Sequence, residues 1–532
     1  MKYDRRDFLK MAGKSFAILS VTSVACGKGA KISSKRPNIL FALADDWSWP
    51  HAGIAGDKMV NTPNFDRIAR EGVLFKNAFA AAPYGTASRS AILTGQWCWR
   101  LKEAANQRGT LAARFDVYPD LLENIGYHVG FTGKGWGPGN FYMGGRTRNP
   151  AGKEYNKFKT TPPTPKMSTC DYTANFEDFL RDCPRNKPFC FWYGGMEPHR
   201  EYLPGSGMKA RKILINASVP KFFPDAEDVQ SDVLDYALEI DWFDTHLGRM
   251  LEVLQKRGEL DNTLIVVSSD NGMPFPRCKN NLYDYGTHVP LAVRWGARVP
   301  GNRVIEDFIS LTDLAPTFLQ AAGLSPTADM TGRSFLDILT SELSGRVDPV
   351  RYKVLMGRER YTFAQESGTG GYPMRAIRIR DFLYIRNFQP ERWPAGVDRS
   401  SSFKENQQSA QKVFLPDSFE PFRDVDSSPT KYHLMGYREN PIVSKYFELC
   451  FGKRPAEELY DLVNDPDQIH NVADDKVYAD VKRTLSNALM EELKASGDPR
   501  VLGNGDVFDN YPAYVPPWTP DNKKTETPVQ DN

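Results

Sequence analysis

The chain has 532 residues, of which 41% are hydrophobic, 12% aromatic and 25% charged. This balance is typical of a soluble globular protein and excludes collagenous, disordered and polytopic membrane classes. The 68 basic and 66 acidic residues leave a formal charge of +2, so a broad basic face for nucleic acid is excluded. We expect two domains, because a single α/β core often runs past about 250 residues.

The first 25 residues are expected to be an export signal and not part of the fold. The segment Asp4–Lys10 (DRRDFLK) resembles a twin-arginine signal, and the apolar run Phe16–Ala25 is shorter than the about 20 residues needed to cross a bilayer. The run ends in SVACG, which resembles a bacterial lipobox with Cys26 as the lipid carrier. A plain signal peptide cleaved nearby is the alternative. We therefore expect a periplasmic or cell-surface protein that touches the membrane only through a lipid on Cys26.

The other six cysteines show no spacing typical of a zinc site. In an exported protein, Cys183 and Cys190 could close a short disulfide loop. The alternative is that they are separate buried thiols.

From about residue 37 to 340, short apolar runs alternate with helical patterns, which predicts an α/β fold with a mostly parallel, covered sheet. Thr62-Pro63 predicts the start of a helix, and apolar residues at helical spacing from Tyr236 to Leu254 predict a core helix that ends before Gly258. The expected strands are Asn38–Ala44, His128–Thr132, Phe189–Tyr193, Leu264–Ser269 and Leu291–Trp295.

After about residue 345 the pattern predicts a smaller α+β domain. Residues 376–385 alternate in polarity like an antiparallel hairpin, and a final helix is expected from about 475 to 496, after a polar stretch at 396–430. We expect the last twenty residues to form an ordered strap or a loose tail. The predicted organisation is a signal at 1–25, an N-terminal domain at 36–345, a C-terminal domain at 346–500 and a tail at 501–532.

Polar residues directly follow four of the five expected strands. Open α/β sheets bind ligands beyond the carboxyl ends of their strands, so these residues are candidate site residues. They are Asp45-Asp46, Gly133-Lys134, Glu197–Arg200 and Asp270–Gly272.

The strongest candidate is a metal site. Asp45, Asp46, Asp270 and Asn271 supply three carboxylates and one amide oxygen, with no Cys or His beside them. Such hard oxygen ligands favour Ca²⁺ or Mg²⁺ over zinc. Either pair alone would more often be an ordinary strand exit or helix cap, but two pairs that end adjacent strands favour a metal.

Five basic residues are expected near this acidic group in the fold. Together with a metal they would suit an anion such as sulfate or phosphate. Each one alone would more often be a solvated surface charge. They are Arg89, Lys134, His199, Arg200 and Lys279.

The segment Gly85–Gly95 (GTASRSAILTG) resembles the sulfatase signature, which reads Cys or Ser, any residue, Pro or Ala, Ser, Arg, four residues and Thr-Gly. Other segments similar to the family are Pro37–Leu40, Asp45-Asp46, Thr62–Asn64, Gly133-Lys134, Pro198-His199, Ser269–Gly272, Glu458–Leu462 and Asn464–Pro466. The likeness is greatest to the heparan N-sulfatase (sulfamidase) branch, through Asp270–Pro276, Asn281–Tyr283 and Tyr372–Arg375.

The resemblance implies an alkaline-phosphatase-like α/β sandwich with a smaller C-terminal sheet domain. It also implies hydrolysis of sulfate esters or N-sulfate groups of a sugar or sulfated polysaccharide with Ca²⁺, or Mg²⁺, as cofactor. The implied metal ligands are Asp45, Asp46, Asp270 and Asn271.

The same resemblance implies roles for the basic residues. Lys134 and Lys279 would neutralise sulfate oxygens, with Lys279 standing where the sulfamidase pattern has Arg. His199 would hydrogen-bond the sulfate and assist the leaving group, and Arg89 would steady the nucleophile. Arg200 and Trp136 are further candidates for contact with the substrate. We also expect specificity residues in the loops 358–372 and 389–399, which are rich in Arg, Tyr and Trp.

Two residues depart from the family pattern. The family nucleophile is a formylglycine hydrate at a helix N-terminus, made by a maturation enzyme from Cys or Ser, but this chain has Gly85, which has no Cβ to oxidise. Trp136 stands where the family usually has His. Either Gly85 stands for a modified or altered Cys or Ser in a working sulfatase, or the chain is an inactive glycan-binding lipoprotein. A phosphoryl transferase using Thr86 ranks last, because it needs a second metal with more His ligands.

Overall fold

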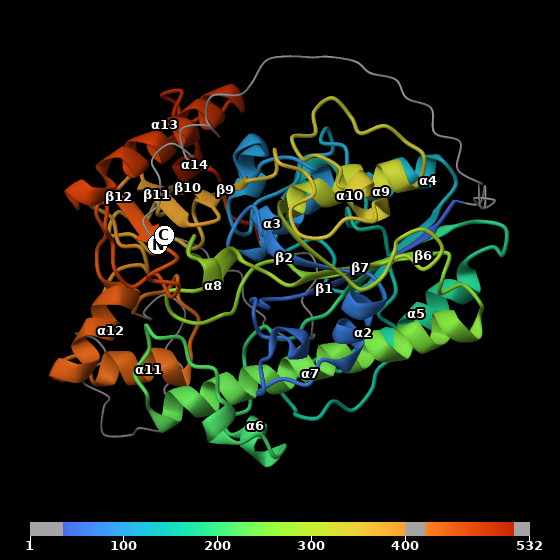
Figure 1. Ribbon diagram of the computed structural model, residues 1–532, viewed down its shortest axis with the longest axis horizontal. Coiled ribbons are helices and arrows are strands. Elements are labelled where there is room, and N and C mark those ends of the chain that lie inside the picture. The colour runs from blue at the N-terminus through green and yellow to red at the C-terminus, as the bar shows by residue number, and fades with distance from the viewer. Residues whose placement is uncertain (1–35, 400–420, 515–532) are drawn as a thin grey trace. The chain divides into compact units, whose positions relative to one another are not determined.

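The computed structural model describes residues 36–399 and 421–514. The signal expected at 1–25, Cys26 and the end of the tail therefore lie outside the described residues. Arg36 begins one compact unit, which holds two β-sheets and their helices (Figure 1). Within the described ranges, every helix is too short or too polar to span a bilayer.

The larger sheet confirms the predicted α/β fold with a mostly parallel sheet. Its strand order is β4-β3-β5-β1-β6-β7-β2-β8. β1 is parallel to both neighbours, whereas β7 runs antiparallel to β6 and β2. The strands are β1 Asn38–Ala44, β2 Val73–Phe79, β3 His128–Gly133, β4 Lys153–Glu154, β5 Phe189–Gly194, β6 Thr263–Ser269, β7 Leu291–Arg294 and β8 Arg303–Ser310.

Helices cover both faces of this sheet. Leu40 and Ala42 of β1 belong to one hydrophobic cluster, whereas Phe41 and Leu43 belong to another, and all four are fully buried. Because successive side chains of a strand point to opposite faces, the alternation requires a covering layer on each side. Figure 1 shows α2, α5 and α7 along one face and α4, α9 and α10 along the other.

Both helix signals noted in this part of the sequence lie on helices, and Thr62-Pro63 begins α2 as expected. The helix predicted around Tyr236–Leu254 is α7, which begins earlier, at Glu227, and ends at Lys256. Cys183 and Cys190 are free thiols, which agrees with the alternative of separate thiols. The helices are α2 Pro63–Glu71, α3 Gly85–Thr94, α4 Tyr118–Asn124, α5 Tyr172–Asp182, α6 Ser206–Lys209, α7 Glu227–Lys256, α8 Asp284–Thr287, α9 Leu314–Ala321 and α10 Leu336–Thr340.

The smaller sheet is antiparallel throughout, with the order β12-β11-β10-β9. The predicted hairpin is the pair β10 and β11, and the predicted last long helix is α13, which packs on these two strands (Figure 1). The elements are β9 Lys353–Arg358, β10 Met374–Ile379, β11 Phe382–Asn387, α11 Pro429–Gly436, α12 Pro441–Phe451, β12 Glu457–Asp461, α13 Ala479–Ala495 and α14 Val507–Asn510.

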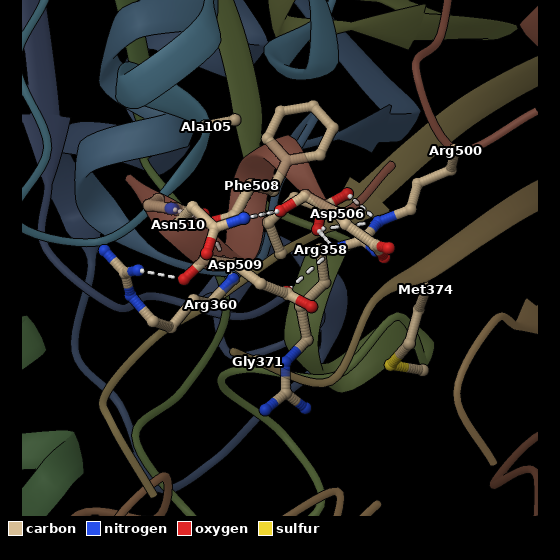
Figure 2. A network of polar contacts seen from close by, with 12 residues as sticks. Ala105, Arg358, Arg360, Gly371, Met374, Arg500, Asp506, Phe508, Asp509 and Asn510 are labelled. Atoms are coloured by element: carbon tan, nitrogen blue, oxygen red, sulfur yellow. Dashed lines mark hydrogen bonds and ion pairs between the residues drawn. The ribbon is translucent and has the colours of Figure 1, made fainter. Parts of the chain in front are cut away.

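The described part of the tail is ordered and is fastened by arginines. Figure 2 shows α14 lying between Arg360 and Arg500. The Arg500 guanidinium donates to an Asp509 carboxylate oxygen at 3.0 Å, and Arg360 donates to the Tyr511 carbonyl at 2.6 Å. The Tyr514 N–H then donates to the Arg108 carbonyl. The described tail residues up to Tyr514 therefore form a strap along the molecule, whereas nearly all of the last twenty residues, for which a strap or a loose tail was expected, lie outside the described residues.

Candidate active site

Three carboxylates meet where β1 and β6 end. The two strands run parallel with Ala44 opposite Ser269, so Asp45 and Asp270 leave the sheet at the same edge. One oxygen from each of Asp45, Asp46 and Asp270 lies within 4.8 Å of the other two, and all three side chains are buried. The two acidic pairs that the sequence singled out thus form one cluster, which we call the acidic cluster.

Asn271 completes the acidic cluster. Its side-chain N–H donates to Asp46 Oδ1 at 2.7 Å, and the Asp46 N–H donates to Asp270 Oδ1 at 3.1 Å. Asp46 holds this position with a positive φ of 80°, a backbone strain that non-glycine residues tolerate mainly at functional sites. Asn271 Oδ1 is buried and has no hydrogen-bond partner among the described residues.

The donor set of the acidic cluster fits a hard divalent cation. It offers three carboxylates and an amide oxygen, which are the ligands that Ca²⁺ and Mg²⁺ prefer. A buried acceptor without a partner costs about 1–3 kcal/mol, and a cation at this place would satisfy Asn271 Oδ1. The metal role of the four residues nevertheless stays a prediction.

Three basic side chains surround the acidic cluster. Arg89, on α3, places Nε 2.8 Å from Asp270 Oδ2 and Nη2 3.5 Å from Asp45 Oδ1. Lys134, just after β3, places Nζ 2.5 Å from Asp45 Oδ2. Lys279 places Nζ 2.8 Å from Asp46 Oδ2. Each carboxylate of the cluster thus contacts at least one permanent cation.

Burial and these cations shift the ionisation of two carboxyl groups in opposite directions. Burial alone would raise the pKa of Asp45, but Lys134 and Arg89 outweigh burial and hold this pKa well below its usual range. Burial raises the pKa of Asp270 to about 7. The negative charge of Asp45 also raises this pKa, whereas the positive charge of Arg89 lowers it. A divalent cation bound beside Asp270 would favour the ionised form of this carboxyl group.

Gly85 is the first residue of α3 and lies beside the acidic cluster. A Cβ at this position would lie 3.3 Å from Asp270 Oδ2 and 3.2 Å from the Gly137 carbonyl oxygen. A side chain at residue 85 would therefore point at the acidic cluster with little room to spare. Gly85 itself has no Cβ, so a formylglycine does not fit the chain as its sequence stands.

The neighbouring hydroxyl is already engaged. Thr86 donates its hydroxyl to the Pro138 carbonyl, and its N–H donates to Gln107 Oε1 at 3.0 Å. A nucleophilic role for Thr86 would require the first of these hydrogen bonds to break, and nothing in the described site favours that role.

His199 faces the acidic cluster. Its Nδ1–H donates to the Arg200 carbonyl at 2.6 Å, and its Nε2 lies 3.9 Å from Asp46 Oδ2. The side chain is 35% exposed, so Nε2 stands between the buried carboxylates and solvent. This is the position from which an imidazole can exchange a proton with a ligand on the cluster.

Two predicted substrate contacts are engaged with other protein groups. The Arg200 side chain is only 5% exposed, makes a bidentate ion pair with Asp232 at 2.7 and 2.8 Å, and stacks on the rings of Tyr202 and Phe275. Trp136 is also buried, and its indole N–H donates to the Ser90 hydroxyl at 2.7 Å. The structure thus gathers the other predicted residues at the cluster and gives these two a supporting environment.

Two residues at the site were not singled out from the sequence, although one of them lies in a loop that was named as a whole. Asp426 reaches Lys279 Nζ at 3.2 Å, although it lies in the polar stretch after β11 and follows no strand. Tyr361, in the loop predicted to hold specificity residues, packs its ring against Tyr84 with centroids 5.8 Å apart. The packing of segments far apart in the chain brings Asp426 to Lys279 and Tyr361 to Tyr84.

Comparisons with known proteins point to one family. The family model described as Sulfatase matches residues 37–324. The chain is 29% identical to an ulvan-active sulfatase of Formosa agariphila, over 87% of this chain and 81% of that protein. It is 27% identical to the N-sulphoglucosamine sulphohydrolase of Homo sapiens, over 89% of this chain and 93% of that protein.

A solved structure shows the same fold. It is the structure of BT4656 in complex with its substrate D-glucosamine-2-N,6-O-disulfate, which aligns with a TM-score of 0.58 and 19% identity. The alignment covers 87% of this chain and 99% of that chain.

Proposed function

Because the chain belongs to the sulfatase family of sulfuric ester and sulfamate hydrolases, we propose that it removes sulfate from a sulfated sugar or polysaccharide with the help of Ca²⁺. The observation that carries the proposal is the buried acidic cluster faced by Lys134, His199 and Lys279. The names of the relatives, which act on ulvan and sulphoglucosamine, support a sugar as the carrier of the sulfate.

The charges of the site support a singly charged anion. Four carboxylates face three permanent cations, so a bound divalent cation leaves one positive charge in excess. A sulfate ester or sulfamate group carries one negative charge and would balance it. The carboxylates are Asp45, Asp46, Asp270 and Asp426, and the cations are Arg89, Lys134 and Lys279.

Each side chain has a place in this proposal. Asp45, Asp46, Asp270 and Asn271 would hold the Ca²⁺, or Mg²⁺, which supplies Lewis-acid polarisation of a sulfate oxygen when bound. The Lys134 and Lys279 ammonium groups donate hydrogen bonds to the remaining sulfate oxygens. His199 exchanges a proton with the leaving oxygen or nitrogen through Nε2.

A second candidate function is binding of sulfated glycans without turnover. Gly85 favours it, because the covalent route of the family needs an oxidised Cβ at this position. Trp136 also favours it, because the buried indole takes the place of a polar imidazole. Under the first proposal the active protein must carry a modified Cys or Ser at residue 85, produced by a maturation enzyme.

One experiment separates the two functions. The mass of the peptide that spans residue 85 is measured, together with Ca²⁺-dependent sulfate release from heparin-like and algal glycans. Formylglycine at residue 85 with release supports hydrolysis, whereas unmodified glycine with binding and no release supports the second candidate. Gly85→Cys, expressed with a maturation enzyme, is the matched gain-of-function variant, and Asp46→Asn is the inactive control. Absence of both binding and release contradicts both functions.

The proposed location is outside the cytoplasm. The segment Asp4–Lys10 and Cys26 support export by the twin-arginine route to the periplasm or cell surface, with a lipid on Cys26 as the membrane anchor. Fractionation of cells that express the full chain or its Cys26→Ala variant tests this. Lipid-dependent membrane association of the full chain alone is expected, and a cytoplasmic full chain contradicts it.

A further inference from the structure

We propose that Asp426 determines specificity by selecting sugars that present a hydrogen-bond donor, instead of a second sulfate, beside the sulfate group held at Lys279. The inference rests on the proposed function, because it assigns a substrate class to the same site. Asp426 lies in the C-terminal half of the chain and does not directly follow a strand, so it is not among the polar residues identified at strand ends.

Asp426 is the outer of two carboxylates that share one ammonium group. Lys279 Nζ lies 2.8 Å from Asp46 Oδ2 on the inner side and 3.2 Å from Asp426 Oδ2 on the outer side. The Lys279 side chain is 5% exposed, whereas the Asp426 side chain is 21% exposed. Asp426 is therefore the more exposed of the two groups, and a sulfate held at Lys279 would lie beside its carboxylate.

The Asp426 carboxylate is ionised and has acceptor capacity to spare. Burial would raise its pKa, but Lys279, His199 and Arg200 outweigh burial and lower this pKa. Oδ2 is buried against Lys279 and makes no hydrogen bond among the described residues, so a ligand from solvent would reach the carboxylate through the part of the side chain that is exposed. An ionised carboxylate only accepts hydrogen bonds, so a hydroxyl or N–H group of the ligand is the complementary partner.

The segment that carries Asp426 is held on both sides. Before it, Asp424 makes a buried ion pair with Arg358 at 2.8 Å and accepts a hydrogen bond from Thr362. After it, the Ser428 hydroxyl accepts from the Lys431 N–H and caps α11. A carboxylate fixed in this way is preorganised for recognition, since little entropy is lost when a ligand binds.

A fixed carboxylate discriminates by attraction and by repulsion. It stabilises a sugar hydroxyl or amine that donates to it, and it repels a second sulfate at the same place. Two like charges about 6 Å apart in a partly exposed site weaken binding by about tenfold or more. The proposal therefore predicts a preference for monosulfated over disulfated glucosamine.

Calorimetric titration in excess Ca²⁺ tests the proposal on the full chain. The probes are inorganic sulfate, D-glucosamine N-sulfate, D-glucosamine 6-sulfate and D-glucosamine-2-N,6-O-disulfate. Asp426→Asn keeps the size of the side chain and removes its charge, and Asp426→Glu keeps the charge. We expect Asp426→Asn to shift the disulfate-to-monosulfate affinity ratio by about tenfold toward the disulfate, and Asp426→Glu to shift it by much less.

Inorganic sulfate is the control probe. In Asp426→Asn, Lys279 loses one carboxylate partner, so every anion is expected to bind more tightly, and the change for inorganic sulfate measures this general gain. An unchanged ratio in Asp426→Asn contradicts the specificity role alone, even if all probes bind more tightly. If the wild-type chain binds neither inorganic sulfate nor any of the sugars, the proposed function is contradicted. The specificity role of Asp426 is then contradicted as well.

Discussion

At the scale of single residues, Asp270 links the acidic cluster to pH. Its pKa is raised to about 7 by burial and by Asp45, against the opposing effect of Arg89. A cation binds the ionised carboxylate, so protons compete with the cation below this pKa. We predict that Ca²⁺ affinity rises about tenfold per pH unit up to about pH 7 and levels off above it. Calorimetry at constant ionic strength measures this, and an affinity that does not change with pH contradicts it.

Individual site residues differ in how well the sequence could locate them. Asp45 and Asp270 could be placed because each follows an apolar run that fills a buried strand. Asp426 could not, because no strand precedes it and the packing of the C-terminal segment brings it to Lys279. Arg200 shows a second limit of prediction from sequence. An arginine at this place was predicted to contact an anionic substrate, but its guanidinium is paired with Asp232.

At the scale of elements, burial decides which strands could be predicted. β1 and β6 are uninterrupted apolar or small-residue runs in the middle of the larger sheet, and both were expected. β2 contains Lys76 and Asn77, and the edge strand β8 contains Glu306 and Asp307. These polar residues interrupt the apolar runs, so neither segment was predicted as a buried strand. The antiparallel direction of β7 could not be predicted either, because direction depends on pairing and not on local composition.

Also at this scale, one buried arginine is expected to hold the turn after α13 to the smaller sheet. Arg375 on β10 makes ion pairs with Glu359 at 2.7 Å and Asp498 at 2.6 Å, and all three side chains are buried. Arg375→Met leaves two buried carboxylates with fewer cations, so we predict that the free energy of unfolding falls by about 3–5 kcal/mol. Denaturation in urea measures the loss.

The matched control is Arg386, which lies directly opposite Arg375 on β11. Its guanidinium is 3.7 Å from Glu457 and the side chain is 40% exposed, so Arg386→Met should cost less than about 1 kcal/mol. Equal losses in the two variants contradict the view that burial makes the Arg375 network important for stability.

At the scale of the whole molecule, the site depends on both halves of the chain. The ends of β1, β3 and β6 supply the acidic cluster and Lys134, whereas the segment before α11 supplies Asp426. The sequence could predict that there are two sheets of these kinds and could predict the first group, because strand ends and buried runs are local patterns. It could not predict how the C-terminal part packs over Lys279, since that depends on contacts between distant segments.

The central claim is that the acidic cluster holds one divalent cation and, with it, a sulfate group. The most direct measurement is calorimetric titration of the metal-free full chain, first with Ca²⁺ and then with inorganic sulfate. We predict one Ca²⁺ per chain, sulfate binding only after Ca²⁺ is bound, and loss of both in Asp46→Asn but not in Arg386→Met. A wild-type chain that binds no divalent cation, or that binds sulfate equally well without one, contradicts the claim.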